Sequence, residues 1–455
     1  MHIIDKYLFD PERMIIYDWT LSKEKITHIN ECVPQEIHDD IFDGLVSKYN
    51  QEIYSSHIAI NAMGICTTYK CNLRCNYCGY SSTEKDKNKL SIRDVEFFIQ
   101  DIIKKSKIKQ MATGKRNPLI IYYTGGGEPT FDWDLFTHSV LFIENYCSKC
   151  DIPYKMSVVT NGVLTNEQTD FIAKHFTRVL ISYDGLPQLQ NANRIGPNIT
   201  DSNSIVVKTI RKMVNCGIPI DIKTTIWHSD CDKLKDMYQH IFSLVPAGSD
   251  VTWSVYPVIP EGRALAQHHK KPKASYDNFL TGYFDLLESI VENEGEDRIN
   301  AVYCPLFARN TITHFCGAMF GDEPFLQPDG SIVLCNESKD YSVCIGSLKN
   351  GELKYFENYD NTFLKVAVEK YDECSNCIAY RFCKGGCPIW HLRNKDLAEE
   401  PIECHATKEY WKHIIKSVIE KKFYLGWMLE KIHIPNIDED VYRLIKKESQ
   451  NEIKQ

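Results

Sequence analysis

The chain has 455 residues, of which 43% are hydrophobic and 25% charged, and its formal net charge at pH 7 is −8. The length suggests more than one domain, and so mild a charge gives no electrostatic footprint for nucleic acid. No apolar run approaches the ~20 residues of a membrane span, and the N-terminus lacks the apolar segment of a signal peptide. We therefore expect neither a nucleic-acid partner nor a membrane partner.

Residues 1–56 precede the first strong strand of the chain. Short strands are predicted at Tyr7–Phe9 and Met14–Tyr17, and the apolar spacing of Glu36–Tyr49 predicts a helix. Two interpretations stay open for this segment: a cap over the following domain or a peptide-binding segment.

From residue 57 the pattern becomes strand, loop and helix, repeated. Continuous apolar strands that alternate with amphipathic helices predict an α/β fold with a parallel sheet covered on both faces. Six such units over residues 57–260 would form a partial, open (β/α)6 barrel that resembles a TIM barrel, with its chemistry at the C-terminal strand ends. The predicted strands are His57–Ile65, Leu119–Thr124, Lys155–Thr160, Val179–Tyr183, Ile220–Ile226 and Val251–Tyr256, and the predicted helices are Ser91–Lys104, Trp133–Tyr146, Asn166–His175, Ser202–Asn215 and Asp232–Leu244.

The second half of the chain has a different character. Residues 261–303 are predicted to bridge to it through a long helix at Tyr276–Glu292, and residues 304–415 form a small, loop-rich, cysteine-rich region. Such a region builds little core of its own, so bound metal would supply its cross-links. Within it, the Asp-Gly turn of Phe325–Leu334 predicts a hairpin, and residues 416–455 read as a helical tail.

The most informative stretch is the loop after the first barrel strand, where Cys71, Cys75 and Cys78 form the pattern C-x3-C-x2-C, with Tyr77 just before the last cysteine. Three thiolates this close can hold three corners of an iron–sulfur cube, which leaves one iron free for a small molecule. Zinc is the alternative ion, although a loop with no fourth ligand nearby suits zinc less well. Such clusters need reduced thiols, which predicts a cytoplasmic protein.

More cysteines follow in the second half of the chain. They read C-x2-C-x5-C-x3-C, with further cysteines on both sides; the set is Cys316, Cys335, Cys374, Cys377, Cys383, Cys387 and Cys404. Paired cysteines in a large chain indicate metal rather than a disulfide scaffold. Zinc again remains the alternative. The separate pair Cys147 and Cys150 is interpreted as free thiols or core. Five others are interpreted as buried small apolar residues: Cys32, Cys66, Cys216, Cys231 and Cys344.

The cysteine loop resembles the signature of the radical S-adenosylmethionine (SAM) superfamily, and the turn Gly126-Gly127-Glu128-Pro129 resembles that family's Gly-Gly-Glu-Pro motif. The resemblance implies a 4Fe–4S cluster whose open iron takes the amino and carboxylate groups of SAM, and reductive cleavage of SAM to a 5′-deoxyadenosyl radical. By the same resemblance the cofactor-binding residues are Gly126, Gly127, Glu128, Asn161, Ser182, Asp184 and Arg194, with Glu128 on the SAM amine and Arg194 on its carboxylate.

The later cysteines resemble a SPASM domain, which implies two auxiliary clusters and three [4Fe–4S] clusters in all. The resemblance assigns one auxiliary cluster to Cys374, Cys377, Cys383 and Cys404, and the other to Cys316, Cys335 and Cys387. The fourth ligand of the latter is either Cys304, which we favour, or absent, which would leave an open iron.

Together these resemblances imply an enzyme that oxidises a side chain of a peptide or protein. The primary expectation is a thioether or carbon–carbon crosslink in a ribosomally made peptide. The alternatives are an anaerobic sulfatase-maturating enzyme, which makes formylglycine from Cys or Ser, and a non-catalytic iron–sulfur electron carrier. A reducing partner such as flavodoxin or ferredoxin is expected. No residue is assigned as a catalytic acid or base.

Overall fold

The computed structural model describes residues 62–259 except 115, and also 261–265, 272–306, 316, 318, 323–337, 342–356, 362–370, 374, 377–383, 385–393 and 401–421. Four short strands between residues 2 and 28 are also described. The predicted helix at Glu36–Tyr49, the first residues of the predicted strand His57–Ile65, and Cys32 lie outside these residues.

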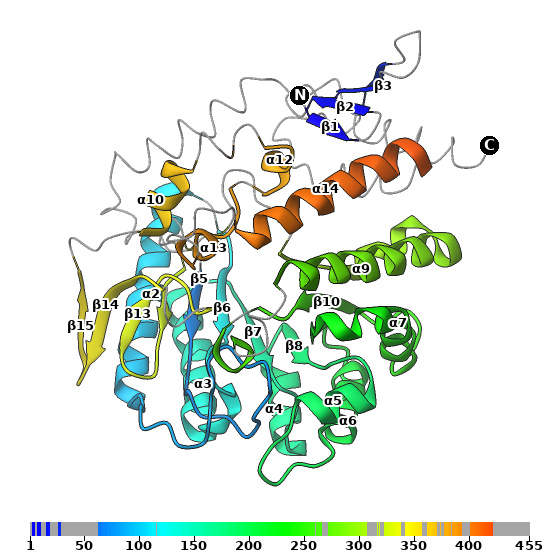
Figure 1. Cartoon of the computed structure of the whole chain (residues 1–455). Helices are drawn as coiled ribbons and strands as arrows, with labels where there is room; N and C mark the ends of the chain where they lie inside the picture. The colour runs from blue at the N-terminus through cyan, green and yellow to red at the C-terminus, as the bar shows by residue number, and fades with distance from the viewer. Residues whose placement is uncertain are drawn as a thin grey trace.

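A parallel sheet forms the centre of the molecule (Figure 1). Each predicted barrel strand is present, and one further short strand, β11, extends the parallel set. The strands run in the order of the sequence, each hydrogen-bonded to the next, as a barrel of β/α units requires. They are β5 (Ala62–Ile65), β6 (Leu119–Tyr123), β7 (Tyr154–Thr160), β8 (Arg178–Ser182), β9 (Ile220–Ile226), β10 (Val251–Pro257) and β11 (Val302–Tyr303).

The connecting helices begin where the sequence places their caps. The Ser91 side chain accepts a hydrogen bond from the Asp94 N–H at the start of α2, and Thr165 and Gln168 form a capping box at the start of α4. The helix α2 extends beyond the predicted end at Lys104, and α5 was not predicted. The helices are α2 (Ile92–Thr113), α3 (Trp133–Cys150), α4 (Asn166–His175), α5 (Pro187–Asn193), α6 (Ser202–Asn215) and α7 (Leu234–Ser243), the last preceded by a 3-10 turn at His228–Lys233.

The core lies between the strands and these helices. On β6, Leu119, Ile121 and Tyr123 are buried, and on α2 the stripe that includes Phe98 and Ile102 is buried against them. The apolar residues spaced along each helix therefore form one buried face, as the sequence predicts.

The C-terminal region continues the same sheet instead of forming a separate layer. The strand β12 (Phe325–Leu326) pairs in parallel with β5, and β13 (Ser331–Val333) returns antiparallel to it, which confirms the predicted hairpin. Two further antiparallel strands, β14 (Cys344–Lys349) and β15 (Glu352–Tyr355), extend the edge. The described part of this region therefore contains two antiparallel strands beyond the predicted hairpin.

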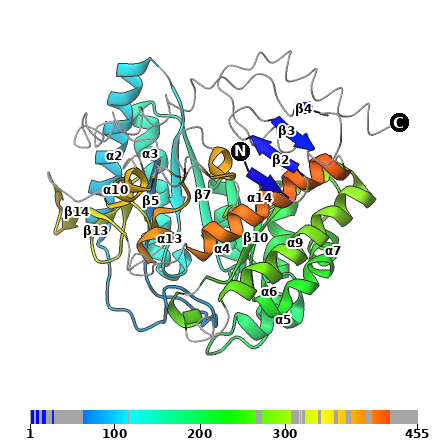
Figure 2. The same cartoon turned by 45° about the horizontal axis from the view of Figure 1, so that its top comes forward.

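Helices complete this half of the molecule. The predicted bridging helix is α9 (Pro272–Glu294), and it packs against α7 and α14 (Ile402–Lys421). Figures 1 and 2 show α9 and α14 side by side. Short helices lie between the cysteines: α10 (Thr362–Glu369), α12 (Tyr380–Cys383) and α13 (Pro388–Arg393). Because α14 runs across the predicted boundary at residue 415, the tail and the cysteine-rich region share one element; the domain bounds otherwise remain predictions.

The N-terminal strands form a sheet of their own. It is an antiparallel meander of β1 (His2–Ile4), β2 (Tyr7–Asp10), β3 (Ile15–Asp18) and β4 (Ile26–His28), and among the described strands it pairs with none of the barrel sheet. Two of the four strands were predicted. None of the described helices is both long and apolar enough to cross a membrane.

Candidate active site

The three cysteines of the loop after β5 lie close together. Burial raises the pKa of the Cys71 thiol to about 12 and that of Cys75 to about 11. Repulsion from Cys78 adds to both increases, so the three sulfurs share one neighbourhood. The Leu73 N–H donates to Cys71 Sγ at 3.4 Å, a contact that stabilises a thiolate and tunes an iron–sulfur cluster.

The chemistry of the donor set favours an iron–sulfur cluster over a single zinc ion. Among the described residues, no group of three or more His, Cys, Asp or Glu side chains could hold a single metal ion. A zinc ion draws its sulfurs to about 2.3 Å from one point, whereas a 4Fe–4S cube is larger and keeps its ligands further apart. Three neighbouring thiols on one loop, supported by a backbone N–H, are a donor set that suits three corners of such a cube.

Arg263 supports the cysteine loop through two hydrogen bonds. Its Nε donates to the Cys75 carbonyl at 2.7 Å and its backbone N–H donates to the Cys78 carbonyl at 3.1 Å. Gly262 makes the approach possible, because a Cβ there would lie 2.2 Å from the Gly79 carbonyl oxygen. Sequence reasoning missed Arg263, which follows β10 and lies far from the cysteines in the chain; its only signal is its place at a strand end.

The Gly-rich turn after β6 lies against the same loop. The Glu128 N–H donates to the Lys70 carbonyl at 2.8 Å, and a side chain on Gly127 would overlap that carbonyl. Glycine is therefore required for the close approach. The Glu128 carboxylate is buried, and burial raises its pKa although Thr160 Oγ1 and the Asn161 N–H both donate to it at 2.8 Å.

Asn161 connects this turn to the cysteines. Its Nδ2 donates to Asn72 Oδ1 at 2.7 Å and lies 3.6 Å from Cys71 Sγ. The turn after β6, the end of β7 and the cysteine loop thus form one polar surface at the C-terminal edge of the sheet, as the sequence predicts. Ser182 closes β8 at the same edge and is partly buried.

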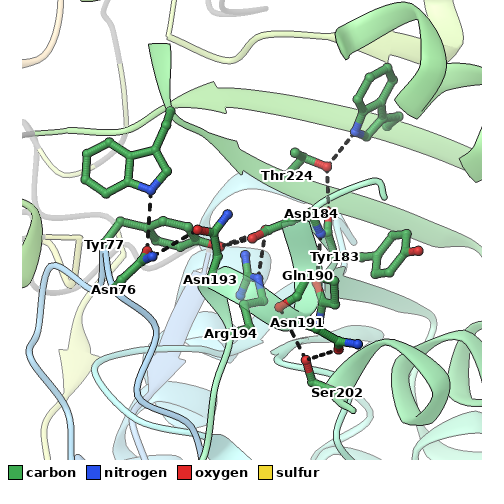
Figure 3. A network of polar contacts seen from close by, with 12 residues as sticks. Asn76, Tyr77, Tyr183, Asp184, Gln190, Asn191, Asn193, Arg194, Ser202 and Thr224 are labelled. Carbon is green, nitrogen blue, oxygen red and sulfur yellow. Dashed lines mark hydrogen bonds and ion pairs between the residues drawn. The ribbon is translucent and has the colours of Figure 1, made fainter. Parts of the chain in front are cut away.

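A buried charge pair lies at the end of β8 (Figure 3). Arg194 Nε donates to Asp184 Oδ1 at 2.8 Å, with only 7% and 1% of the two side chains exposed. The Tyr77 hydroxyl donates to Asp184 Oδ1 at 2.7 Å, and the guanidinium lies 5.4 Å from the centroid of the Tyr77 ring. Although burial disfavours its charge, the Asp184 carboxylate holds the pKa of Arg194 above its ordinary value.

A second set of contacts fixes Tyr77 in place. Asn76 Nδ2 donates to Asn193 Oδ1 at 2.9 Å, and Trp227 Nε1 donates to Asn76 Oδ1 at 3.4 Å (Figure 3). The Tyr77 and Trp227 rings lie 6.2 Å apart. The residues between the second and third cysteines are therefore the part of the loop that contacts the residues following β8 and β9.

The second cysteine region shows a related geometry. Burial raises the pKa of Cys335, and repulsion from Cys387 and Cys316 adds to the increase, so these three sulfurs are neighbours. The Glu337 N–H donates to Cys335 Sγ at 3.4 Å. This group of three is the one that the sequence assigns to an auxiliary cluster.

Cys377 repeats the local pattern of Cys71 and Cys335: the N–H two residues later, that of Ala379, donates to its Sγ at 3.4 Å. Cys383 lies nearby on α12, where its Sγ is 3.4 Å from the position of a Cβ on Gly386. Cys374 and Cys404 are partly buried. Their assignment to the other auxiliary cluster stays a prediction.

Cys304 is 3% exposed and lies beside Tyr276, whose pKa it helps to raise. Its role as a cluster ligand also stays a prediction. Among the cysteines interpreted as buried apolar residues, Cys66 and Cys231 are buried, and their thiols donate to the Thr68 and Trp227 carbonyls. For two others the prediction was wrong: Cys216 ends a helix and Cys344 begins an outer strand, and both are exposed.

Comparison with known proteins agrees with this geometry. The family model of the radical SAM superfamily matches residues 65–237, which hold the three cysteines of the loop and the strand-end residues. A cysteine-type anaerobic sulfatase-maturating enzyme of Clostridium perfringens is 23% identical over 359 residues, which are 77% of this chain and 94% of that enzyme. The radical SAM cyclopropyl synthase TigE of Paramaledivibacter caminithermalis is 26% identical over 72% of this chain and 68% of its own.

Solved structures show the same fold. The native anSMEcpe structure with bound AdoMet and Cp18Cys peptide is 19% identical and superposes with a TM-score of 0.62, covering 79% of this chain and 98% of that one. The structure of that protein with AdoMet alone gives a TM-score of 0.59.

Proposed function

We propose, from the premise that this chain is a radical SAM enzyme that modifies a protein or peptide, that it oxidises a cysteine side chain to formylglycine, as a sulfatase-maturating enzyme does. The observation that carries the proposal is the extent of the similarity to the Clostridium perfringens maturase, which spans 94% of that enzyme. The premise removes the alternative of a non-catalytic electron carrier.

The residues fit the cofactors that this reaction needs. Cys71, Cys75 and Cys78 would hold a 4Fe–4S cluster, and Glu128 and Arg194 would bind the amine and carboxylate of SAM. Bound together, the cluster and SAM supply a 5′-deoxyadenosyl radical. The chain positions SAM against the cluster and excludes water from it, because the Glu128 and Asp184–Arg194 contacts are buried.

The oxidation releases an electron, and accepting it is the role we propose for the second cysteine region. Oxidation of a cysteine to a thioaldehyde removes two hydrogen atoms: bound SAM would supply the radical that accepts one, and the other would leave as an electron and a proton. Water then replaces sulfur, which departs as hydrogen sulfide. The thiols of Cys316, Cys335 and Cys387 converge beside the barrel, and with the remaining cysteines they would hold two auxiliary clusters that accept the electron. Reduction by flavodoxin or ferredoxin in the cytoplasm would supply the first electron.

The test is an anaerobic incubation of the reconstituted enzyme with SAM, dithionite and a synthetic sulfatase peptide that carries cysteine at the modified position. We expect 5′-deoxyadenosine and an aldehyde on that residue, both measured by mass spectrometry. A matched peptide with alanine at the position controls for uncoupled cleavage of SAM. Formation of 5′-deoxyadenosine without any aldehyde would overturn the formylglycine proposal.

A second candidate is the crosslinking of a ribosomally made peptide, the primary expectation from the sequence. The similarity to the cyclopropyl synthase TigE favours it, at 26% identity. The same assay with a short peptide encoded beside the gene separates the two, because a crosslinked product loses two hydrogens and carries no aldehyde.

A further inference from the structure

Two buried amide side chains lack a partner for their N–H2 groups. Gln327 is 4% exposed and Asn336 5% exposed, and neither Gln327 Nε2 nor Asn336 Nδ2 has a hydrogen-bond partner among the described residues. An unsatisfied buried donor destabilises the fold, so each of these groups calls for an explanation such as a ligand.

The two amides belong to one patch, formed by Gln327, Asn336, Tyr69 and Tyr80. The Tyr69 hydroxyl donates to Gln327 Oε1 at 3.0 Å. The Tyr69 and Tyr80 rings stack with centroids 6.2 Å apart, and the Tyr80 hydroxyl donates to the Asn336 carbonyl. The Gln327 carboxamide therefore offers only its N–H2 group to a ligand.

This patch lies between the two cysteine regions. Gln327 directly follows β12, the strand that pairs with β5. A side chain on Gly126 would collide with both tyrosine rings, so the patch borders the Gly-rich turn. Asn336 directly follows Cys335 in the chain. A molecule bound here would contact the barrel site and the second cysteine group together.

The charges around the patch determine whether a charged or a neutral hydrogen-bond acceptor can bind there. Two carboxylates accompany the amides in the chain, because Asp329 stands two residues after Gln327 and Glu337 directly follows Asn336. This negative field disfavours an anionic acceptor such as a carboxylate or phosphate. Two neutral N–H2 donors in such a field suit neutral carbonyl oxygens, which an extended peptide main chain presents in series.

We propose that Gln327 and Asn336 hold the main chain of the peptide substrate between the SAM site and the second cysteine group, by donating hydrogen bonds to its carbonyls. The proposal rests on the proposed function, because it assumes a peptide substrate. The N–H2 groups are covered in this conformation, so peptide binding requires a covering side chain to be displaced; of the four patch residues, Tyr80 is the one that is only partly buried.

The test measures equilibrium binding by fluorescence anisotropy, with SAM present and no reductant. The probes are the labelled sulfatase cysteine peptide and a labelled pool of random decapeptides. Gln327→Glu and Asn336→Asp keep the acceptor oxygen and remove the N–H2 group, and Asn336→Leu removes it without adding charge. Each should raise the Kd of the reconstituted enzyme for peptide about tenfold or more, as loss of a buried hydrogen bond predicts.

The matched control is Gln110→Glu. Gln110 is also a buried amide, but its Nε2 already donates to the Asn117 carbonyl at 3.0 Å, at the far end of α2. The Kd of the Gln110→Glu variant for peptide should stay within about twofold of the wild-type value. Iron content, SAM affinity and circular dichroism establish that each variant is folded.

The outcomes separate this inference from the proposed function. Unchanged peptide affinity in Gln327→Glu and Asn336→Leu overturns the inference even where the wild type makes formylglycine. Failure of the wild type to bind either probe overturns it as well. Weakened binding in the variants supports it even where the wild-type enzyme modifies neither probe, which would count against the proposed function alone.

Discussion

Arg194 illustrates what one residue contributes to the site. The family resemblance implies that it pairs with the SAM carboxylate, and the structure pairs its Nε with Asp184 at 2.8 Å. A guanidinium carries five N–H donors, so this ion pair is compatible with a second, ligand-directed contact. For both contacts arginine would suit better than lysine, because a planar fork can hold a fixed carboxylate with one edge and a ligand with another.

The substitution Arg194→Lys tests this double role. We expect the Kd for SAM to rise about tenfold or more, because the lysine cannot serve both partners, while the iron content stays at the wild-type level. Equilibrium dialysis with labelled SAM measures the first quantity and iron analysis the second. Retention of wild-type SAM affinity by the lysine variant would contradict the assignment.

Asp221 gives a prediction about pH. It is 2% exposed and accepts from the Tyr303 hydroxyl at 2.7 Å, and burial raises its pKa above the ordinary value of 3.8. A carboxyl with a raised pKa stabilises the fold fully below its ordinary value, and this contribution is lost as pH rises through the folded pKa.

The variant Asp221→Asn removes that titration without changing the shape of the side chain. As the pH rises above the ordinary value of 3.8, the apparent melting temperature of the wild type should therefore fall relative to that of the variant. Differential scanning fluorimetry over this range checks the sign. Parallel pH profiles for the two proteins would show that Asp221 is not the titrating group.

Short motifs, together with the family resemblance, were enough to single out Cys71, Glu128 and Arg194 as candidates. Each follows a strand at the C-terminal edge of the sheet, and their roles stay predictions. Arg263, Gln327 and Asn336 could not be found this way, because their roles arise from contacts with residues far away in the chain. No periodicity records a tertiary contact of that kind.

At the scale of elements, periodicity located the six barrel strands and five barrel helices but not all of their ends. The helices Asn166–His175 and Ser202–Asn215 end where predicted. The helix α2 continues to Thr113, and Gly114, with a positive φ of 67°, ends it. The predicted end at Lys104 was too early, because the polar residues that follow form a solvated face of the same helix. The sheet formed by β12–β15 was predicted only as a hairpin, since its pairing with β5 is a long-range contact.

The joint between β5 and β12 depends on one glycine. A Cβ on Gly64 would lie 1.7 Å from Phe325 Cδ1, so Gly64→Ala forces the ring away from the strand. We expect a loss of about 1–3 kcal/mol in stability, seen as a lower apparent melting temperature. Gly79→Ala is the control, because its Cβ would make only an ordinary contact at 3.6 Å with Glu261.

A second substitution tests the cause. If steric overlap is responsible, Phe325→Leu should recover part of the lost stability in the Gly64→Ala background while destabilising the wild type on its own. Additive losses in the double variant would argue against the overlap.

At the scale of the whole molecule, Arg393 joins the barrel to the C-terminal helix. Its Nη2 donates to Glu261 at 2.6 Å and its Nη1 donates to Glu403 at 2.8 Å. Glu261 precedes the Gly262–Arg263 pair that supports the cysteine loop, and Glu403 lies on α14 next to Cys404. One guanidinium therefore connects the supports of both cysteine regions.

Replacing Arg393 with methionine leaves the Glu403 carboxylate, 2% exposed, without its counter-charge. We expect a loss of about 3–5 kcal/mol, measured as an earlier transition in thermal unfolding, together with lower iron retention. Lys212→Met breaks the more exposed pair with Asp170 and should change stability by no more than about 1 kcal/mol. Equal losses of stability and of bound iron in the two variants would contradict this connecting role of Arg393.

The pairing of β5 with β12 also has a consequence for biosynthesis. On the ribosome, β5 emerges early, but the strand that covers its outer edge is not made until residue 325 has left the exit tunnel. Until then the nascent chain carries an uncovered apolar edge, Ala62–Ile65, of the kind that promotes aggregation. A chain truncated after Tyr303 should accordingly collect in inclusion bodies, while the full-length chain, expressed alongside it, stays in the supernatant.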